Sequence, residues 1–187
     1  MVLRNALGVV ELSGISRGYL VQDAILKSSN VEKLVSRTIC SGKYFIAVQG
    51  ELADVENAIS VANEIGSFAI VNTSVIPSLD PKIFPAIAGS TVIESKTKIG
   101  ALLVIETFSV VSAIKAADYA VKEANVDLLR IHVAMAIGGK GLVVITGDIG
   151  ALEAAVQPAI KNCQQDGMLA DYIIIKNPHS DVLRELL

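Results

Sequence analysis

The sequence predicts an α/β protein of the α+β kind, composed of two tandem ferredoxin-like domains that each have the split βαβ order. The first observation behind this prediction is an internal repeat: residues 23–31 return as residues 118–126, with Asp, Lys, Asn and Val at the same positions. Glu11 and Glu106 share the same spacing of 95 residues. A repeat of this length indicates a duplicated domain and not a short solenoid unit.

The second observation is hydrophobic periodicity, which gives the same order of elements in both halves. In the first half it predicts strands over residues 6–12, 31–39, 43–49 and 68–75, and helices over 15–29 and 54–65. In the second half it predicts strands over 99–106, 128–135, 142–146 and 172–176, and helices over 110–123 and 152–163. The two domains are therefore assigned to residues 1–90 and 96–187, with a linker at 89–98. Prolines at positions 77, 81 and 85 predict short pieces before that linker.

Composition limits the classes of function. The chain has 187 residues, of which 52% are apolar, and a mean hydropathy of +0.55, yet no apolar run reaches the roughly 18 residues of a membrane span. A net charge of −3 and an aromatic content of 4% argue against nucleic-acid binding. No secretory signal is visible, and two cysteines give no disulfide framework. We expect a cytoplasmic, reduced oligomer whose excess apolar surface is buried between subunits.

The repeated motifs resemble those of bacterial microcompartment shell domains. They are Asp-Ala-x-x-Lys-x-x-Asn-Val from Asp23, a Gly-Lys turn in each half, and Gly-Asp-x-Gly-Ala-x-x-Ala-Ala over residues 147–155. One such domain in each half makes the chain similar to the tandem-domain shell proteins. The resemblance implies a non-enzymatic homotrimer that mimics a hexamer with six sectors, in a shell within the cytoplasm, next to other shell proteins.

The segment Thr-Ile-Cys-Ser-Gly-Lys at residues 38–43 sharpens the resemblance. A member of the family carries a similar loop, with Pro in place of Ser41, and its cysteines hold an iron–sulfur cluster at a central pore. The resemblance implies that Cys40 is such a ligand, with one [4Fe–4S] cluster for each trimer. The cluster would serve as an electron conduit to an encapsulated or cytosolic redox enzyme, or as a redox plug. Loss of Pro is expected to loosen the loop.

A physical argument supports Cys40 independently. It precedes a Ser41-Gly42 turn, where a side chain can project from the core, and threefold symmetry would gather three thiols around one axis. A [4Fe–4S] cluster takes four ligands, so one iron would bind solvent or a small molecule. The alternative is a small buried cysteine that only packs. The resemblance further implies a pore lined by Ile39, Cys40, Ser41, Gly42, Ile137, Gly138, Gly139 and Lys140.

Two repeated lysines are candidates for contacts between tiles. Lys27 and Lys122 occupy equivalent places, three residues before the repeated Asn. The resemblance places the matching lysine at the tile edge, although a solvated surface charge is the simpler interpretation of any single lysine. The family's usual edge arginine is replaced by Ser78 in the first half, so edge packing should differ from that of single-domain relatives.

Other interpretations remain. Cys163 has no second ligand at metal-binding spacing and is expected to pack inside a helix, and His132 is expected to be a satisfied histidine on a sheet face. Residues 138–141 lack the spacing of a phosphate-binding loop. An alternative function is a small-molecule-binding oligomeric regulator without a cluster. An enzyme is the least favoured class, since no His, Ser or metal cluster surrounds the repeated acids.

Overall fold

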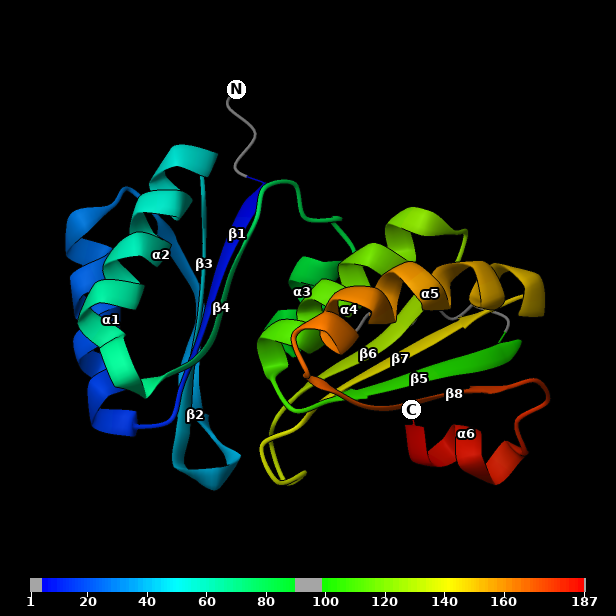
Figure 1. The fold of residues 1–187 in the computed structure, drawn as a ribbon. Helices are drawn as coiled ribbons and strands as arrows, with labels where there is room; N and C mark the ends of the chain where they lie inside the picture. The colour runs from blue at the N-terminus through cyan, green and yellow to red at the C-terminus, as the bar shows by residue number, and fades with distance from the viewer. Residues whose placement is uncertain (1–4, 90–98, 187) are drawn as a thin grey trace.

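The first half forms a four-stranded sheet with two helices on one face (Figure 1). The computed structural model describes residues 5–89 and 99–186. Its first-half elements are β1 (Ala6–Leu12), α1 (Ile15–Ser28), β2 (Glu32–Ile39), a 3₁₀ turn (Cys40–Gly42), β3 (Lys43–Gly50), α2 (Leu52–Gly66), a second 3₁₀ turn (Ser67–Ala69) and β4 (Ile70–Ile76).

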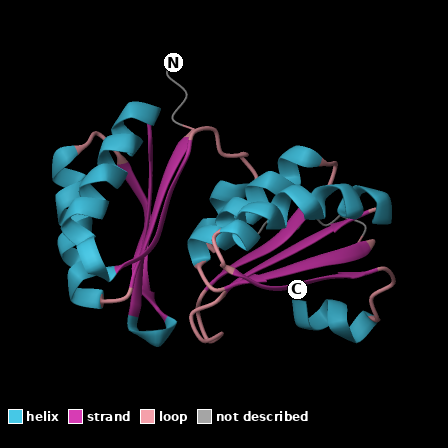
Figure 2. Ribbon diagram, in the orientation of Figure 1, coloured by secondary structure: helices cyan, strands magenta, loops and turns pink. Residues whose placement is uncertain are grey.

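The second half repeats this arrangement after a short helix, α3 (Ile83–Ala88). Its elements are β5 (Ala101–Thr107), α4 (Val110–Glu123), β6 (Asp127–Val133), β7 (Gly141–Gly147), α5 (Ile149–Gln165), β8 (Leu169–Ile175) and α6 (Ser180–Leu186). Figure 2 shows the two helix-covered sheets side by side, with α6 on the face of the second sheet opposite α4 and α5. Among the described residues, no helix is long and apolar enough to cross a membrane.

The strand order confirms the predicted fold. It is β2-β3-β1-β4 in one sheet and β6-β7-β5-β8 in the other, and every described pairing is antiparallel. This is the order that a ferredoxin-like split βαβ unit produces. The register also matches between halves, because Leu7 pairs with Ile76 as Leu102 pairs with Ile175. Equivalent residues of the last strands, β4 and β8, are therefore 99 residues apart.

The two halves share part of their core. All seven residues of β1 are buried, since helices cover one face of its sheet while α3 and the second half cover the other. One apolar cluster runs from Leu7 and Phe45 of the first half through Ile83 of α3 to Ala117 of α4. The sheet and helices α1 and α2 enclose a separate cluster around Ile25. The halves thus fold against each other.

Two helices were missed by the sequence prediction. Pro85 lies inside the first turn of α3, where a missing N–H costs no helical hydrogen bond, so the prolines permit a helix at 83–88. Helix α6 is short and lies beyond the last repeated strand. β4 begins at residue 70 because 67–69 form a 3₁₀ turn, and β8 begins at 169, earlier than predicted. Of the predicted linker at 89–98, Gly89 ends α3 and residues 90–98 lie outside the described residues.

Candidate functional site

Cys40 lies where two loops meet that are far apart in the sequence. Its backbone N–H donates to the Ala134 carbonyl oxygen at 3.0 Å. The Ala136 N–H in turn donates to the Cys40 Sγ at 2.9 Å. Cys40 is half-buried, and the neighbouring Ser41 is exposed. The 40–42 turn and the 134–140 loop therefore form one unit, which we call the cysteine loop pair.

The backbone of the cysteine loop pair adopts unusual conformations. Ser41 has a φ of 65°, and Ala134 and Ala136 have φ of 47° and 61°. Non-glycine residues rarely adopt this left-handed region, which costs about 1 kcal/mol or more for each residue. Proline could not adopt it, because its ring holds φ near about −65°. Ser41 in place of Pro therefore does more than loosen the loop: it permits a backbone path that Pro would forbid.

Lysine side chains hold the cysteine loop pair to the sheets. The Lys43 ammonium donates to Glu11 Oε1 at 2.8 Å and to the Gly139 carbonyl oxygen at 3.5 Å. The Ser41 hydroxyl donates to the Gly138 carbonyl oxygen at 3.3 Å. Because Lys43 contacts both a loop and a buried carboxylate, it ties the position of the turn to the junction between the halves.

Glu11 is the centre of that junction. Its side chain is 0% exposed, and its carboxylate accepts hydrogen bonds from the Ser109 hydroxyl at 2.7 Å and the Val110 N–H at 2.8 Å. Ser109 and Val110 begin helix α4, whose first N–H groups have no partner inside the helix. Glu11 thus neutralises Lys43 and caps a helix of the other half. A buried carboxylate is costly without hydrogen-bond partners, and Glu11 has three.

The predicted pore residues gather at the cysteine loop pair, with one exception. The Ile39 side chain is 4% exposed and packs in the shared core, so it does not face an opening. Ser41, Gly42 and Gly138 are exposed, and Gly139 is buried. Lys140 is half-buried, and its ammonium lies 3.1 Å from the Glu106 carboxylate.

A single chain offers one thiol to a metal cluster. Within residues 5–89 and 99–186, no three His, Cys, Asp or Glu side chains are grouped so that they could hold a metal ion. Cys163 is buried in α5, where its thiol donates to the Ser112 carbonyl oxygen at 3.5 Å, and this confirms its packing role. Burial raises the pKa of the Cys163 thiol, which disfavours the thiolate that a metal needs.

The Cys40 thiol nevertheless has features that suit a cluster ligand. It is half-buried on an exposed turn, its backbone is fixed by Ala134, and its sulfur accepts an N–H from Ala136. Hydrogen bonds to sulfur are a means by which proteins stabilise and tune iron–sulfur clusters. One such thiol could supply one ligand, so a cluster at this site would have to take its other ligands from outside the chain.

The repeated lysines differ in their surroundings. Lys122 bonds to Asp118 at 2.5 Å and to the Ser78 carbonyl oxygen, so it lies against the first half. Lys27 pairs with Asp23 at 2.7 Å on an exposed face. The two lysines are equivalent in the repeat, but the Lys27 side chain is 75% exposed and the Lys122 side chain is 42% exposed.

Sequence reasoning missed the residues that position Cys40. Ala134 and Ala136 act through backbone groups, which no side-chain pattern reveals. His132 accepts from Arg130 at 2.8 Å and donates to the Met135 carbonyl oxygen, as expected of a satisfied histidine. These bonds shape the 134–140 loop. The only signal in the sequence was the two-residue excess of the second loop over the first.

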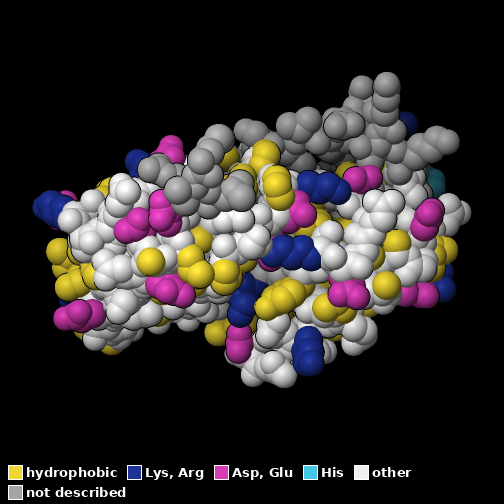
Figure 3. Space-filling model, turned by 90° about the horizontal axis from the view of Figure 1, so that it is seen from above, with side chains coloured by type: hydrophobic (Ala, Val, Ile, Leu, Met, Phe, Trp, Pro, Cys, Tyr) yellow, Lys and Arg dark blue, Asp and Glu magenta, His cyan; other side chains and the backbone are white. Residues whose placement is uncertain are grey.

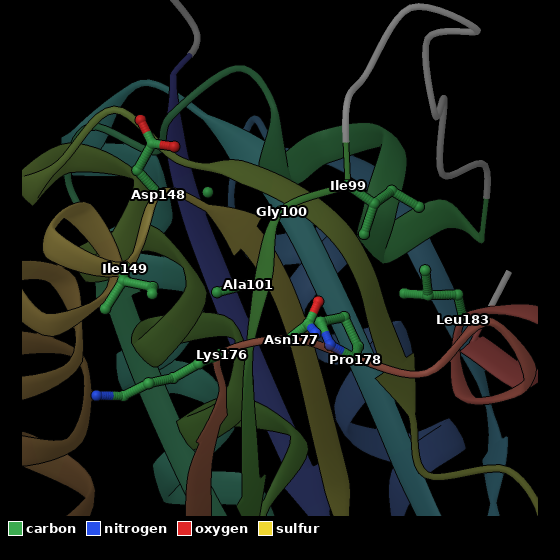
Figure 4. A pocket seen from close by; sticks show the side chains of 10 residues that line it. Ile99, Gly100, Ala101, Asp148, Ile149, Lys176, Asn177, Pro178 and Leu183 are labelled. Atoms are coloured by element: carbon green, nitrogen blue, oxygen red, sulfur yellow. The ribbon is translucent and has the colours of Figure 1, made fainter.

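A separate hollow of about 310 Å³ lies between the sheet of the second half and α6. Figure 4 shows Ile99 and Leu183 on one side of it, while the Lys176 side chain extends away. The Lys176 ammonium lies 4.0 Å from Glu153 outside the hollow. No buried charged side chain lines this hollow, so it gives no specific support to a small-molecule regulator.

Comparison with known proteins matches both halves to one family. Residues 6–79 and residues 101–178 each match the BMC domain. The chain belongs to the BMC-domain family. The predicted duplication is thus confirmed, and each BMC domain contains one of the two four-stranded sheets.

Two known proteins match nearly the full length of the chain, and a third matches less than half of it. The chain is 36% identical over 185 residues to the bacterial microcompartment shell protein PduT of Citrobacter freundii, covering 99% of each chain. It is also 37% identical to the shell protein PduA of the same organism over 84 residues. This match covers 44% of this chain and 86% of PduA. A solved microcompartment protein from Desulfitobacterium hafniense aligns with a TM-score of 0.84 and 35% identity, covering 96% of this chain and 98% of that one.

Proposed function

We propose that this protein is a non-enzymatic shell component of a bacterial microcompartment, located in the shell within the cytoplasm. The observation that carries the proposal is the pair of BMC domains docked through Glu11 within one chain. PduT, similar over its whole length, is a shell protein. Three chains with two BMC domains each would supply six sectors to a closed ring, since closed rotational symmetry is the usual arrangement for identical subunits.

The same proposal assigns Cys40 to a [4Fe–4S] cluster, one for each trimer. Three Cys40 thiolates, one from each chain, would hold three irons, and the fourth iron would take a solvent or small-molecule ligand. The cysteine loop pair supports this role through the Ala136 N–H on the sulfur and the exposed position of the turn. Such a group supplies one-electron chemistry, which suits an electron conduit or a redox plug across the shell.

The chain's own residues would position the thiol and limit access to it. Ala134 fixes the Cys40 backbone, and Lys43 fastens the turn to Glu11. The exposed Ser41 and Gly138 would lie beside the thiol at the pore. Lys27 and Lys122 are assigned to contacts between neighbouring tiles. Other shell proteins and a redox enzyme on one side of the shell would be the partners.

The shell role is tested by assembly. Purified protein should be a trimer in dilute solution by sedimentation and should form extended sheets when it is concentrated, as seen by negative-stain electron microscopy. A discrete oligomer that never forms sheets, alone or with other shell proteins, would favour the regulatory alternative.

The cluster is tested by iron and sulfide analysis after anaerobic purification or reconstitution. Wild-type protein and Cys163→Ser should bind about four irons for each trimer, because Cys163 is buried away from the loop pair. Cys40→Ser should remain trimeric and contain no iron. Equal iron in Cys40→Ser and wild type would refute the assignment of Cys40.

A further inference from the structure

The junction inside one chain provides a template for the contact between chains. The repeat gives Glu106 and Lys140 the positions of Glu11 and Lys43, and their charged groups lie 3.1 Å apart, as those of Glu11 and Lys43 lie 2.8 Å apart. The Glu11 side chain is fully buried by α4, whereas that of Glu106 is 37% exposed. The second half therefore presents the same ion pair on an open surface.

Helix α1 presents the complementary surface. It is the repeat equivalent of α4, and both helices have 14 residues. Ile114 of α4 is fully buried, whereas its equivalent Tyr19 in α1 is 61% exposed. The first turn of α1 contains no acidic residue, and its N-cap Gly14 has no side chain to accept the first N–H groups. The first N–H of α4 donates to the Glu11 carboxylate, whereas the start of α1 has no side-chain acceptor of this kind.

The register of the last strand identifies a second contact. Asn72 lies opposite Glu11 in the first sheet, and Asp171 lies opposite Glu106 in the second. The Asn72 amide donates to the Ser112 hydroxyl of α4 at 3.1 Å. The equivalent of Ser112 in α1 is Arg17, because Gly14 of the N-cap corresponds to Ser109. The neutral Asn72–Ser112 pair within the chain thus corresponds to Asp171 of one chain and Arg17 of another.

A third pair of positions changes from polar residues in one half to apolar residues in the other. Ser74 and Lys115 line one hollow of about 290 Å³ at the junction within the chain. Their repeat equivalents are Ile173, which is 56% exposed, and Leu20, which is also exposed. Two polar residues that line one hollow within the chain therefore correspond to two apolar residues, both of which are exposed when the chain is alone. Figure 3 shows hydrophobic side chains on the surface of both halves, on the face that it views.

We propose that β5 and β8 of one copy dock on α1 of a second copy through Asp171–Arg17, Ile173–Leu20 and a Glu106 cap on the Ile15 N–H. This inference rests on the trimer of the proposed function and specifies its contacts. The two kinds of junction alternate around the ring and share a glutamate cap. They differ beside it, because an Asn72–Ser112 hydrogen bond joins the halves within a chain, whereas an ion pair and an apolar contact join the chains. Such a difference favours correct pairing, because an unmatched charge is left buried in any other arrangement.

Arg17 is free to make this contact. Its guanidinium lies 5.6 Å from the centre of the Phe68 ring and donates weakly to the Ile65 carbonyl oxygen at 3.5 Å. Neither interaction uses a carboxylate, and a guanidinium has five N–H donors. Asp171 accepts only the N–H of its neighbour Tyr172 among the hydrogen bonds of the described residues.

The test is a charge-reversal cycle measured by sedimentation equilibrium over a dilution series. Arg17→Asp and Asp171→Arg should each weaken trimer formation by about tenfold or more in dissociation constant, because each places like charges together. The double variant with both changes should recover most of the loss. Lys161→Asp on the exposed face of α5 has the same charge change as Arg17→Asp and should leave the trimer unchanged.

The outcomes separate this inference from the proposed function. Circular dichroism should show native folding for every variant, since Asp171 and Lys161 are exposed and Arg17 is only half-buried. A wild-type protein that is not a trimer would overturn the proposed function itself. A wild-type trimer with unaffected single variants, or with no recovery in the double variant, would overturn the contact and leave the trimer intact.

Discussion

Ser109 donates its hydroxyl hydrogen to the buried Glu11 carboxylate at 2.7 Å, across a sequence separation that spans half of the chain. This contact joins two domains that could otherwise be mistaken for independent units. The Glu11 carboxylate is fully used by these contacts, because it accepts hydrogen bonds from the first residues of α4 and from Lys43. The duplication therefore repeats the Glu–Lys pair at the junction as well as the domain itself.

The first prediction compares the two repeated acids. Glu11→Gln should lower the free energy of unfolding by about 3 kcal/mol, because it leaves Lys43 without its carboxylate in a buried junction. Glu106→Gln should cost less than about 1 kcal/mol in dilute monomer, because its ion pair with Lys140 is partly solvated. Urea denaturation measures both, with the monomeric state checked by sedimentation. Equal costs would show that the junction is not held by Glu11.

The second prediction concerns the accessibility of the two thiols. In the cluster-free protein, Cys40 should react with iodoacetamide, since it is half-buried on an exposed turn. Cys163 should stay unmodified until the protein unfolds, because it is buried and its thiolate is disfavoured. Mass spectrometry of digested protein locates the modification. After reconstitution, protection of Cys40 should appear, and unprotected Cys40 in iron-loaded protein would contradict its role as a ligand.

The third prediction is a pH dependence of stability. Burial raises the pKa of the Cys163 thiol above its ordinary value of 9.0. A raised folded-state pKa gives a contribution that is complete below the unfolded-state pKa and is lost as pH rises through the folded-state value. The free energy of unfolding should therefore fall above pH 9.0 more steeply in wild type than in Cys163→Ala. Parallel curves for the two proteins would contradict this.

The fourth prediction uses two glycines in helices. A Cβ on Gly18 of α1 would lie 2.3 Å from the Tyr44 ring, so Gly18→Ala should destabilise the protein by about 1–3 kcal/mol. A Cβ on Gly150 of α5 would meet no atom within 4 Å, and Gly150→Ala should be neutral or stabilising by up to about 1 kcal/mol. Thermal unfolding of the two variants distinguishes them. A harmless Gly18→Ala would show that α1 does not pack so closely on β3.

The duplicated fold could be predicted because the pattern of apolar residues and the internal repeat can both be recognised in the sequence alone. Residues 23–31 and 118–126 repeat because each fills the same place on a helix and the following turn. Helix α3 was missed because proline usually ends helices, and only its place in the first turn makes Pro85 acceptable. Helix α6 follows β8 as α3 follows β4, and it was missed because a helix of seven residues is too short for its periodicity to be recognised.

The candidate site was predictable only in part. Cys40 and the Gly-Lys turns could be found from residue types and spacing. The Ala136 N–H on the Cys40 sulfur could not, because it depends on a backbone conformation with positive φ at Ala134 and Ala136. The burial of Ile39 was also missed, since a residue next to a turn can face either the core or the surface.

The most direct measurement is native mass spectrometry of anaerobically reconstituted protein, with Cys40→Ser measured beside it. The account predicts a species of three chains plus one [4Fe–4S] cluster for wild type, and three chains without a cluster for the variant. A cluster that persists in Cys40→Ser, or a wild-type trimer that remains bare after reconstitution, would contradict the claim that three Cys40 thiolates meet at one axis.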